Sequence, residues 1–289
     1  MIRRPEGLPA GLAALERTAV MGVLNVTPDS FSDGGAYLAP PAAVEHGIRL
    51  FEEGADLVDV GGESTRPGAH RVPAAEECHR VLPVVRGLVD AGVPVSIDTM
   101  CAATAAAAVA TGACLVNDVS GGLADPEMYT AVAGLGVPYI AMHWRGLTHR
   151  MQDLAAYGDV VVDVRDELDQ RVRAAMAAGI APERIVVDPG LGFAKETSHN
   201  WSLLSHLDSL DELGLPILIG ASRKRFLGAL LTDDAGQPRP VGERDAATDA
   251  VTAIAATRGV WAVRVHDVRG SKDAVRVAAA WIEGGGSRG

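Results

Sequence analysis

Short apolar segments recur along the chain, and each one ends in polar residues. Eight such segments are present, rich in Val, Ile and Leu and with little alternation between apolar and polar positions. Segments of this kind are typical of strands buried on both faces of a parallel sheet. The predicted strands are Thr18–Val26, Leu57–Gly61, Pro94–Ile97, Cys114–Val116, Pro138–Met142, Ile185–Val187, Pro216–Ile219 and Trp261–Val265.

Segments richer in alanine and charge separate the apolar segments, and they predict helices. Clear examples are Ala42–Glu53, Ala74–Asp90, Val160–Ala178 and Arg244–Arg258. Glycines stand near the ends of many of them, where the left-handed conformation often terminates a helix. Asp125 followed by Pro126 is interpreted as an N-cap and a first helical residue.

Eight strand–helix units without a linker predict an α/β chain built as a single-domain (β/α)8 TIM barrel, and the length of 289 residues fits this fold better than a doubly wound sheet. We expect residues 1–17 to form an N-terminal extension, 18–283 the barrel and 284–289 a disordered tail. The stretch Thr232–Glu243 is expected to be a surface loop.

Composition excludes several classes of function. The net charge of −11 argues against a nucleic-acid partner, because such proteins usually carry a basic excess. No segment is apolar enough for a membrane span or a signal peptide, so we expect no membrane partner. Three cysteines without paired spacing fit a reducing, cytoplasmic location. The sequence also lacks the motifs of a P-loop, a zinc site and a nucleophile elbow.

Polar residues at the strand ends indicate chemistry, since a TIM barrel places its active site at the carboxyl ends of its strands. A single Asp at a strand end is often only a helix cap, and Asp118 and Asp267 are interpreted as caps or surface groups. Polar groups nevertheless follow nearly all eight strands, which favours a site. Arg264 and His266 are two residues apart and therefore face the same side of the last strand.

Two groups of side chains indicate the chemical class of the ligand. The first, on one rim, offers donors suited to phosphate or diphosphate oxygens and contains Asn25, Arg66, Arg264 and His266. The second, deeper in the barrel, suits a flat heterocycle with donor and acceptor edges and contains Asp98, Asn117, Asp188 and Lys224. Met142 and Phe193 are candidates to sandwich the faces of that ring.

Seven motifs, in order along the chain, resemble those of the dihydropteroate synthase family, and the match runs from about Val20 to about Ile282. They are MGVLNVTPDSFSDGG (21–35), DVGGESTRPGA (59–69), SIDT (96–99), NDVSGG (117–122), DPGLGF (188–193), GASRKRFLG (220–228) and VRVHDV (263–268). The resemblance implies a transferase of folate biosynthesis. Its members join 6-hydroxymethyl-7,8-dihydropterin diphosphate to 4-aminobenzoate and release diphosphate. They are targets of sulfonamides and are typically homodimers.

The resemblance also implies a role for individual residues. Asp98, Asn117, Met142, Asp188, Phe193, Gly220 and Lys224 would bind the pterin. Asn25, Arg66, Arg264 and His266 would bind the diphosphate. Phe31, Thr65, Pro67, Ser222 and Arg223 would surround 4-aminobenzoate. Asn25 and Asp33 would hold Mg²⁺. Asp98, Asp188, Lys224, Arg264 and His266 would carry the catalysis. We expect the loops at residues 27–38 and 64–72 to be mobile and to close over the ligands.

Two alternatives remain open from the sequence. A methyltetrahydrofolate-type methyltransferase shares a pterin-binding barrel but has no diphosphate to neutralise, so the rim of Arg66, Arg264 and His266 argues against it. A non-catalytic pterin-binding paralogue is the second alternative. Such a copy should have lost some loop motifs, and those of this chain match throughout.

Overall fold

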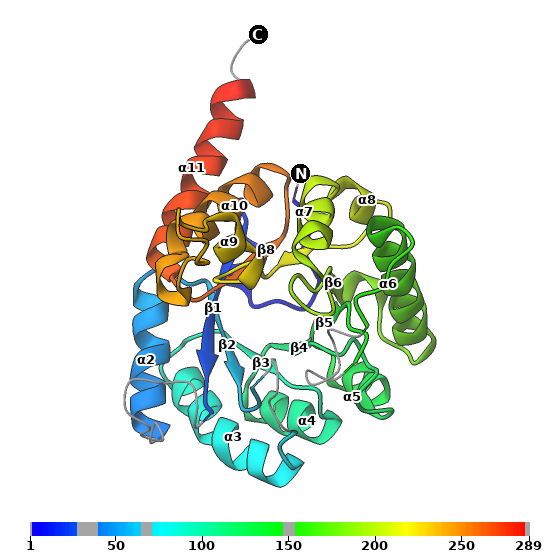
Figure 1. Ribbon diagram of the computed structural model, residues 1–289. Coiled ribbons are helices and arrows are strands. Elements are labelled where there is room, and N and C mark those ends of the chain that lie inside the picture. Colours follow the sequence, from blue (N-terminus) through cyan, green and yellow to red (C-terminus); the bar gives the residue numbers. More distant parts are fainter. Residues whose placement is uncertain (1, 28–39, 65–70, 147–153, 287–289) are drawn as a thin grey trace.

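Eight parallel strands form a nearly closed barrel, and helices surround it (Figure 1). The structure is a computed structural model that describes residues 2–27, 40–64, 71–146 and 154–286. The hydrogen-bonded order is β6-β5-β4-β3-β2-β1-β8-β7, and a parallel bridge between Val187 and Ile217 joins β6 to the segment before β7. The predicted (β/α)8 TIM barrel is therefore confirmed.

The strands lie where the apolar segments predict them, with ends shifted by about one or two residues. Several strands extend beyond the apolar segment, so that polar residues such as Asp98 and Asn117 belong to the sheet itself. The strands are β1 Ala19–Asn25, β2 Leu57–Gly61, β3 Val95–Asp98, β4 Leu115–Asp118, β5 Tyr139–Met142, β6 Ile185–Asp188, β7 Leu218–Ile219 and β8 Ala262–Val265.

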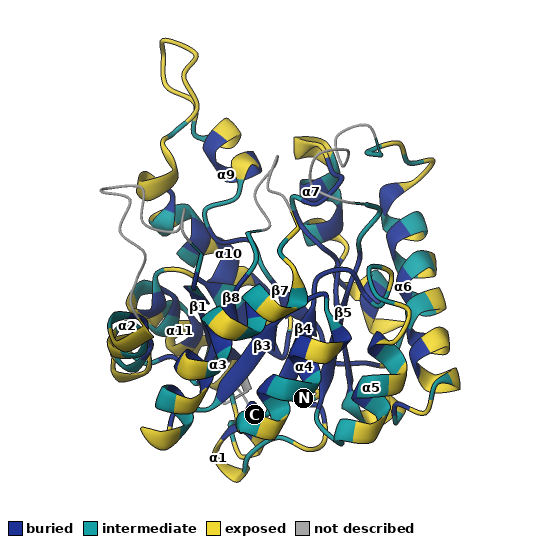
Figure 2. Cartoon of the chain, turned by 90° about the horizontal axis from the view of Figure 1, so that it is seen from below, coloured by how far each residue is buried: buried dark blue, intermediate teal, exposed yellow. Residues whose placement is uncertain are grey.

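Helices follow the strands and cover the outside of the barrel (Figure 2). The predicted helix Ala74–Asp90 is confirmed at both ends, and the other three predicted helices differ at their ends by one or two residues. The helices are α1 Ala10–Ala13, α2 Pro40–Glu52, α3 Ala74–Asp90, α4 Ala102–Thr111, α5 Met128–Leu135, α6 Val160–Ala177, α7 Thr197–Ser205, α8 Asp208–Asp211, α9 Arg225–Leu230, α10 Asp245–Thr257 and α11 Val268–Gly286, with 3₁₀ turns at Pro182–Arg184 and Val241–Glu243.

Two apolar cores explain why the strands lack an amphipathic pattern. Alternate residues point to opposite faces of the sheet. On β1, Val20 belongs to a cluster shared with the helices, whereas Met21 belongs to a second cluster inside the barrel. The inner cluster joins Met21 to Leu115 of β4 and Leu218 of β7. Both faces of each strand are therefore buried in apolar surroundings.

The N-terminal segment covers the end of the barrel opposite to α9 (Figure 2). Leu12 of α1 is buried in the inner cluster, and Leu8 and Leu15 pack against it. The N–H of Glu6 donates to the carbonyl of Glu183 at 2.7 Å, and Arg17 forms an ion pair with Asp56. This segment, predicted only as an extension, closes the amino-terminal end of the barrel.

Two local predictions differ from the structure at their boundaries. The helix α5 begins at Met128, two residues after the predicted first helical residue Pro126, although the Asp125 carboxylate accepts from the N–H of Glu127 as a cap does. The same carboxylate accepts from the N–H of Ala102 and so also caps the start of α4. The helix α11 continues to Gly286, three residues into the segment expected as a tail. Extending an existing helix costs much less than starting one, so the helix runs into glycines that disfavour it.

The loop predicted at Thr232–Glu243 is confirmed, apart from the 3₁₀ turn Val241–Glu243 at its end. Among the residues that the structure describes, none of the helices combines the length and the apolar character that crossing a bilayer requires.

Candidate active site

Most of the predicted polar residues at the strand ends line one cavity at the carboxyl end of the barrel. Asp98 is not one of the lining residues: it is buried and bonded to Arg264, which lines the cavity. Asn117, Asp188 and Arg264 each stand two residues beyond an apolar residue of the inner cluster, so their side chains point to the same barrel interior. The cavity measures about 420 Å³, within the range of small-molecule sites. Its predicted lining residues are Asn25, Asn117, Met142, Asp188, Phe193, Gly220, Ser222, Arg223, Lys224, Arg264 and His266.

Arg264 links two acidic residues across the base of the cavity. Its Nε donates to Asp59 Oδ2 and its Nη2 donates to Asp98 Oδ2, both at 2.6 Å. Asn117 Nδ2 donates to the same Asp59 oxygen at 2.9 Å. Four strands thus contribute to one network, in which Asp59 is fully buried. The fork of a guanidinium can hold two carboxylates in fixed positions, which an ammonium cannot.

Asp59 is a site residue that the sequence analysis missed. It lies inside the predicted strand Leu57–Gly61, with its side chain on the same face as Leu57 of the inner cluster. A buried acid in an otherwise apolar strand is costly unless it is paired. An acidic residue within a strand predicted to be buried on both faces was therefore the signal that could have found it. Its Oδ1 has no hydrogen-bond partner in the described part of the chain.

The charges at the base of the cavity are mutually dependent. Burial raises the pKa of Asp98 to about 7, against the lowering effect of Arg264 and with a further rise from Asp59. Burial also raises the pKa of Asp188, although the N–H of Gly190 and the charge of Lys224 oppose this. Burial lowers the pKa of Lys224 to about 8, and Asp188 limits that fall. Paired acids and bases with displaced pKa values are typical of functional sites.

The loop after β6 brings Phe193 to the cavity. Asp188 Oδ1 accepts from the N–H of Gly190 at 2.7 Å and so fixes the first turn of the loop. Gly190 has a φ of +65°, and an added Cβ would lie 2.2 Å from the carbonyl oxygen of His143, so only glycine fits. Phe193 packs with Met142 in a small apolar cluster, and Lys224 Nζ lies 4.2 Å from its ring centroid.

His266 and Ser222 face each other at the mouth of the cavity. Ser222 Oγ accepts from the backbone N–H of His266 at 3.1 Å and lies 2.9 Å from His266 Nδ1. The His266 ring is exposed toward the cavity. The surrounding protein lowers its pKa, and the positive charge of Arg264 lowers it further. His266 is therefore neutral at pH 7 and acts as a hydrogen-bonding group rather than a cation.

Arg223 is held in a left-handed conformation beside the cavity, with a φ of +57°. Its guanidinium forms two hydrogen bonds with Asp245, at 2.6 and 2.7 Å, and its N–H donates to Thr248 Oγ1. Its carbonyl accepts from Arg244. Strained residues are often found at functional sites, where surrounding contacts compensate for the cost. Here the contacts come from the start of α10 and fix the turn that presents Ser222 and Lys224.

Comparisons with known proteins agree with this geometry. Residues 21–266 match the family of pterin binding enzymes. The dihydropteroate synthase of Mycobacterium leprae (strain TN) is 53% identical over 273 residues, which cover 94% of this chain and 96% of that protein. The chain belongs to the dihydropteroate synthase family.

Solved structures support the same assignment. The Xanthomonas albilineans dihydropteroate synthase, solved with 4-aminobenzoic acid and with 7,8-dihydropteroate, has TM-scores of 0.84 and 0.81 at 47% and 44% identity; both structures cover 92% of this chain and 94% of that one. The Yersinia pestis enzyme in a sulfonamide drug complex has a TM-score of 0.88 at 39% identity, covering 98% of this chain and all of that one. Members of this family are transferases of folate biosynthesis that bind a pterin and are targets of sulfonamides.

Some predicted site residues lie outside the described part of the chain. They are Phe31, Asp33, Thr65, Arg66 and Pro67. The two loops expected to close over the ligands fall largely in the same ranges, at 28–39 and 65–70. Of the proposed metal ligands, Asn25 is described and lines the cavity.

The prediction that Asp118 is a cap or a surface group is correct for the cap and wrong for the surface. Its side chain points away from the barrel interior and is fully buried. It accepts from the N–H groups of Ser120 and Gly122 and from the hydroxyl of Tyr139 at 2.8 Å. Asp118 is thus an internal cap of the turn after β4, because the helices cover the outer face of the sheet. Asp267 precedes α11 and is half-buried, as expected of a cap or surface group.

Several cavity residues were not singled out in the sequence. The most informative is Lys195, which is only 6% exposed. Arg225, the first residue of α9, is another. The sequence GLGFAK was visible as a motif, but nothing in it shows that its lysine is buried. The remaining cavity residues beyond the prediction are Val23, Thr27, Ser64, Val119, Leu191, Gly192, Thr197, Asn200, Phe226, Val241 and Arg244.

Proposed function

We propose that this chain condenses 6-hydroxymethyl-7,8-dihydropterin diphosphate with 4-aminobenzoate to give 7,8-dihydropteroate and diphosphate. The observation that carries the proposal is the cavity itself. Its base combines buried carboxylates, an amide and an ammonium, and its mouth carries further donors. The ligands found in the related Xanthomonas albilineans enzyme, 4-aminobenzoic acid and 7,8-dihydropteroate, support the choice of substrates.

The base of the cavity is proposed to bind the pterin. The carboxylates of Asp98 and Asp188 would accept from the ring and exocyclic N–H groups, while Asn117 and Lys224 would donate to the ring acceptors. Met142 and Phe193 would cover the two ring faces. A Cβ added at Gly220 would have nothing nearer than 3.8 Å, which is Asp188 Oδ2, so the backbone there leaves room for a ring edge.

The mouth of the cavity is proposed to bind the diphosphate through Asn25, Arg66, Arg264 and His266. The two bonds of Arg264 to carboxylates use only part of its donors, so N–H groups remain for an anion. Mg²⁺ would be held by the amide oxygen of Asn25, a hard ligand, and by Asp33, because Mg²⁺ often binds with one or two protein oxygens and substrate phosphates. When bound, it would neutralise charge on the leaving diphosphate.

We infer a dissociative displacement. The bond between the pterin methylene carbon and the diphosphate oxygen breaks first, and the electron pair leaves with the diphosphate. Asp98 and Asp188 stabilise the positive charge that spreads over the methylene and the ring, since buried charges act strongly on a developing ion. The neutral amine of 4-aminobenzoate then bonds to the methylene carbon and loses a proton to solvent. No strong base is needed, because an aromatic amine is unprotonated at pH 7.

Phe31, Thr65, Pro67, Ser222 and Arg223 are proposed to surround the 4-aminobenzoate. Within the described residues, Ser222 and Arg223 both line the mouth of the cavity. A sulfonamide that mimics 4-aminobenzoate should therefore inhibit competitively with that substrate. The sulfonamide complex of the Yersinia pestis relative supports this part of the proposal.

The decisive experiment is release of diphosphate by the purified protein with Mg²⁺ and the pterin diphosphate, with and without 4-aminobenzoate. Stoichiometric formation of 7,8-dihydropteroate and diphosphate is expected with both substrates. Pterin binding without any release would identify a non-catalytic paralogue. The dissociative step predicts slow hydrolysis of the pterin diphosphate when 4-aminobenzoate is omitted. If the C–O bond is cleaved only when the amine is present, the dissociative step is contradicted.

A homodimer in the cytoplasm completes the proposal. Large apolar side chains are exposed on the packed pair α10 and α11: Ile254, Val277, Trp281 and Ile282. Trp281 is 78% exposed, and α11 extends beyond the ring of helices (Figure 1). An apolar face of this kind fits a second copy of the chain. Light scattering should give a dimeric mass, and Trp281→Asp should reduce it to that of a monomer. The free state of all three cysteines supports the reducing compartment.

A further inference from the structure

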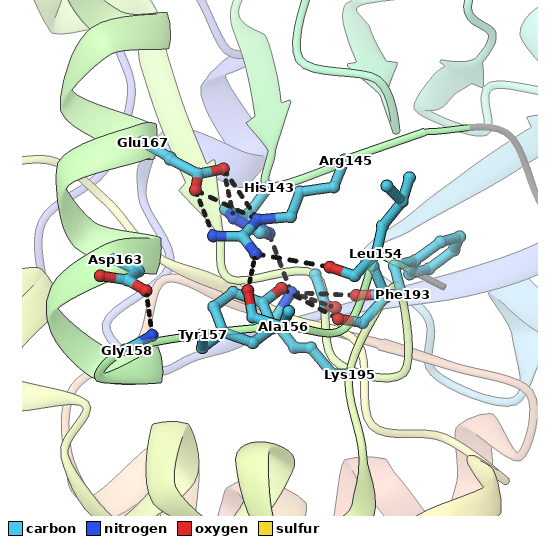
Figure 3. A network of polar contacts seen from close by, with 12 residues as sticks. His143, Arg145, Leu154, Ala156, Tyr157, Gly158, Asp163, Glu167, Phe193 and Lys195 are labelled. Atoms are coloured by element: carbon cyan, nitrogen blue, oxygen red, sulfur yellow. Dashed lines mark hydrogen bonds and ion pairs between the residues drawn. The ribbon is translucent and has the colours of Figure 1, made fainter. Parts of the chain in front are cut away.

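Lys195 is a buried lysine of the cavity wall to which the proposed reaction assigns no role. It lies in the loop after β6, and its Nζ contacts three acceptors (Figure 3): His143 Nδ1 at 2.9 Å, and the carbonyl oxygens of Gly190 and Phe193 at 3.1 Å each. An ammonium has three N–H donors, so these contacts satisfy it completely. Lys195 therefore ties both ends of the Gly190–Phe193 turn to His143, the residue directly after β5.

The histidine that accepts from Lys195 is itself fixed. His143 is 1% exposed, and its Nε2 lies 3.1 Å from Glu167 Oε2 on α6. Burial and the charge of Lys195 lower the pKa of His143 to about 4, so the ring is neutral at pH 7. Since Nδ1 accepts from the ammonium, Nε2 carries the hydrogen and donates to Glu167. Arg145 also donates to Glu167, which anchors the network to α6 (Figure 3).

A second contact holds the residue after Phe193. Ala194 has a φ of +47°, which is unusual for a residue other than glycine, and its carbonyl accepts from the Tyr157 hydroxyl at 2.9 Å. The guanidinium of Arg145 lies 3.8 Å from the Tyr157 ring centroid and so fixes that ring. The carbonyls of Gly190, Phe193 and Ala194 are thus all held by Lys195 and Tyr157, and the Phe193 side chain is directed to the cavity.

We propose that Lys195 is a positioning residue, which sets the Phe193 ring against the pterin and, through that ring, the ammonium of Lys224. The proposal rests on the pterin-binding role proposed for Phe193. Lys224 Nζ lies 4.2 Å from the Phe193 ring centroid, so a displaced ring would also release the lysine. His143, Glu167 and Tyr157 act with Lys195 as its supports.

A charged lysine suits this place better than an apolar residue. Without its ammonium, the Phe193 carbonyl and His143 Nδ1 would lose their donor inside the protein, and the Gly190 carbonyl would keep only the N–H of Phe193. This loss disfavours the loop conformation. Burial lowers the pKa of Lys195 to about 7, while Asp188 opposes the fall. A neutral amine would keep only two N–H donors for the three acceptors, so the complete set of contacts requires the charged form.

The position of Phe193 can be observed directly. The chain contains only four phenylalanines, so 4-fluorophenylalanine labelling should give few ¹⁹F resonances, and Phe193→Leu assigns the relevant one. In Lys195→Met, the Phe193 resonance should shift and broaden without ligand, whereas the others should stay unchanged. Lys272→Met is the matched control, because Lys272 is an ion-paired lysine near the amino-terminal end of the barrel. An unchanged Phe193 resonance in Lys195→Met would overturn the proposal.

Ligand binding gives the second readout. In Lys195→Met the dissociation constant for a pterin should rise by about tenfold to a hundredfold, as expected when a contacting group is misplaced by about 1 Å. Affinity for inorganic diphosphate should change less than about twofold, since its proposed ligands lie elsewhere. Lys195→Arg, which retains charge and donors, should recover part of the pterin affinity. Equal losses for both ligands would indicate general damage to the fold and contradict a positioning role.

Failure of this inference is distinguishable from failure of the proposed function. If Phe193→Leu binds pterin as well as the native protein does, the proposed pterin contact is wrong, while the ¹⁹F shift still reports whether Lys195 holds the ring. If Phe193→Leu weakens pterin binding and Lys195→Met does not, the pocket stands and the positioning role of Lys195 is refuted.

Discussion

Arg264 Nη2 and Asp98 Oδ2 lie 2.6 Å apart, and this bond makes the base of the cavity one electrostatic unit. Arg264 was expected to serve the diphosphate, yet two of its nitrogens are bonded to the carboxylates of Asp59 and Asp98. The arginine therefore connects the proposed pterin and diphosphate sites. A substitution of either carboxylate should therefore affect binding at both the pterin and the diphosphate site.

Replacing Arg264 by lysine should be far from conservative. Lysine keeps the charge but loses the fork that reaches both carboxylates, and breaking a buried pair typically costs about 3–5 kcal/mol. We expect turnover to fall by at least about a hundredfold, with weaker binding of both pterin and diphosphate. Steady-state kinetics and calorimetry measure this. The exposed Arg276→Lys serves as control, and loss confined to diphosphate would contradict the connecting role.

Asp59→Asn should lower the affinity for pterin although Asp59 is fully buried below the cavity. The substitution preserves shape but removes the charge that orients Arg264 and Asn117. Because Asp59 raises the pKa of Asp98, its removal should also move the acidic limb of pterin binding to lower pH. Fluorescence titration of a pterin between pH 5 and 8 tests both effects. An unmoved acidic limb would refute the coupling.

Pterin binding should depend on pH with an optimum between about 7 and about 8. Below the pKa of Asp98, about 7, the carboxylate is protonated and loses acceptor strength. Above the pKa of Lys224, about 8, the ammonium loses a proton and a donor. Lys224→Met should abolish turnover and remove the alkaline limb of the binding profile. Persistence of that limb in the variant would assign it to another group.

His266→Gln should keep part of the affinity for diphosphate. The pKa of His266 lies below its usual value, so the native ring is neutral at pH 7 and contributes a hydrogen bond, which an amide can partly replace. We expect a loss of about tenfold or less, because one neutral hydrogen bond contributes about 1 kcal/mol. The ratio of native to variant affinity should stay constant from pH 6 to 8. A ratio that falls as pH rises would show a charged imidazole.

Leu12→Ala should destabilise the barrel without changing its chemistry. Leu12 is 4% exposed and fills the inner cluster at the end opposite the cavity. Loss of a buried leucine typically costs about 2–5 kcal/mol of the free energy of unfolding. Urea denaturation should show this, while KM for both substrates stays unchanged. Leu230→Ala, at a site 62% exposed, should have little effect on unfolding.

The sequence by itself determined the fold class and most of the site. Uniformly apolar segments predict strands buried on both faces, and polar residues such as Asn117 and Asp188 directly after them mark the carboxyl end of the barrel. The motifs identified the family, since their residues must contact the same substrates in every member. Patterns of this kind involve residues that are close in sequence, so they can be recognised without the tertiary structure.

Only the tertiary structure decided which of these residues touch one another. Asp59 and Arg264 are 205 positions apart, and their contact depends on the closure of β1 and β2 against β8. Lys195 looks like an ordinary loop lysine until His143 and two carbonyls surround it. Burial and pKa arise from elements far away in the chain, and a pattern read along the chain contains no distances between them.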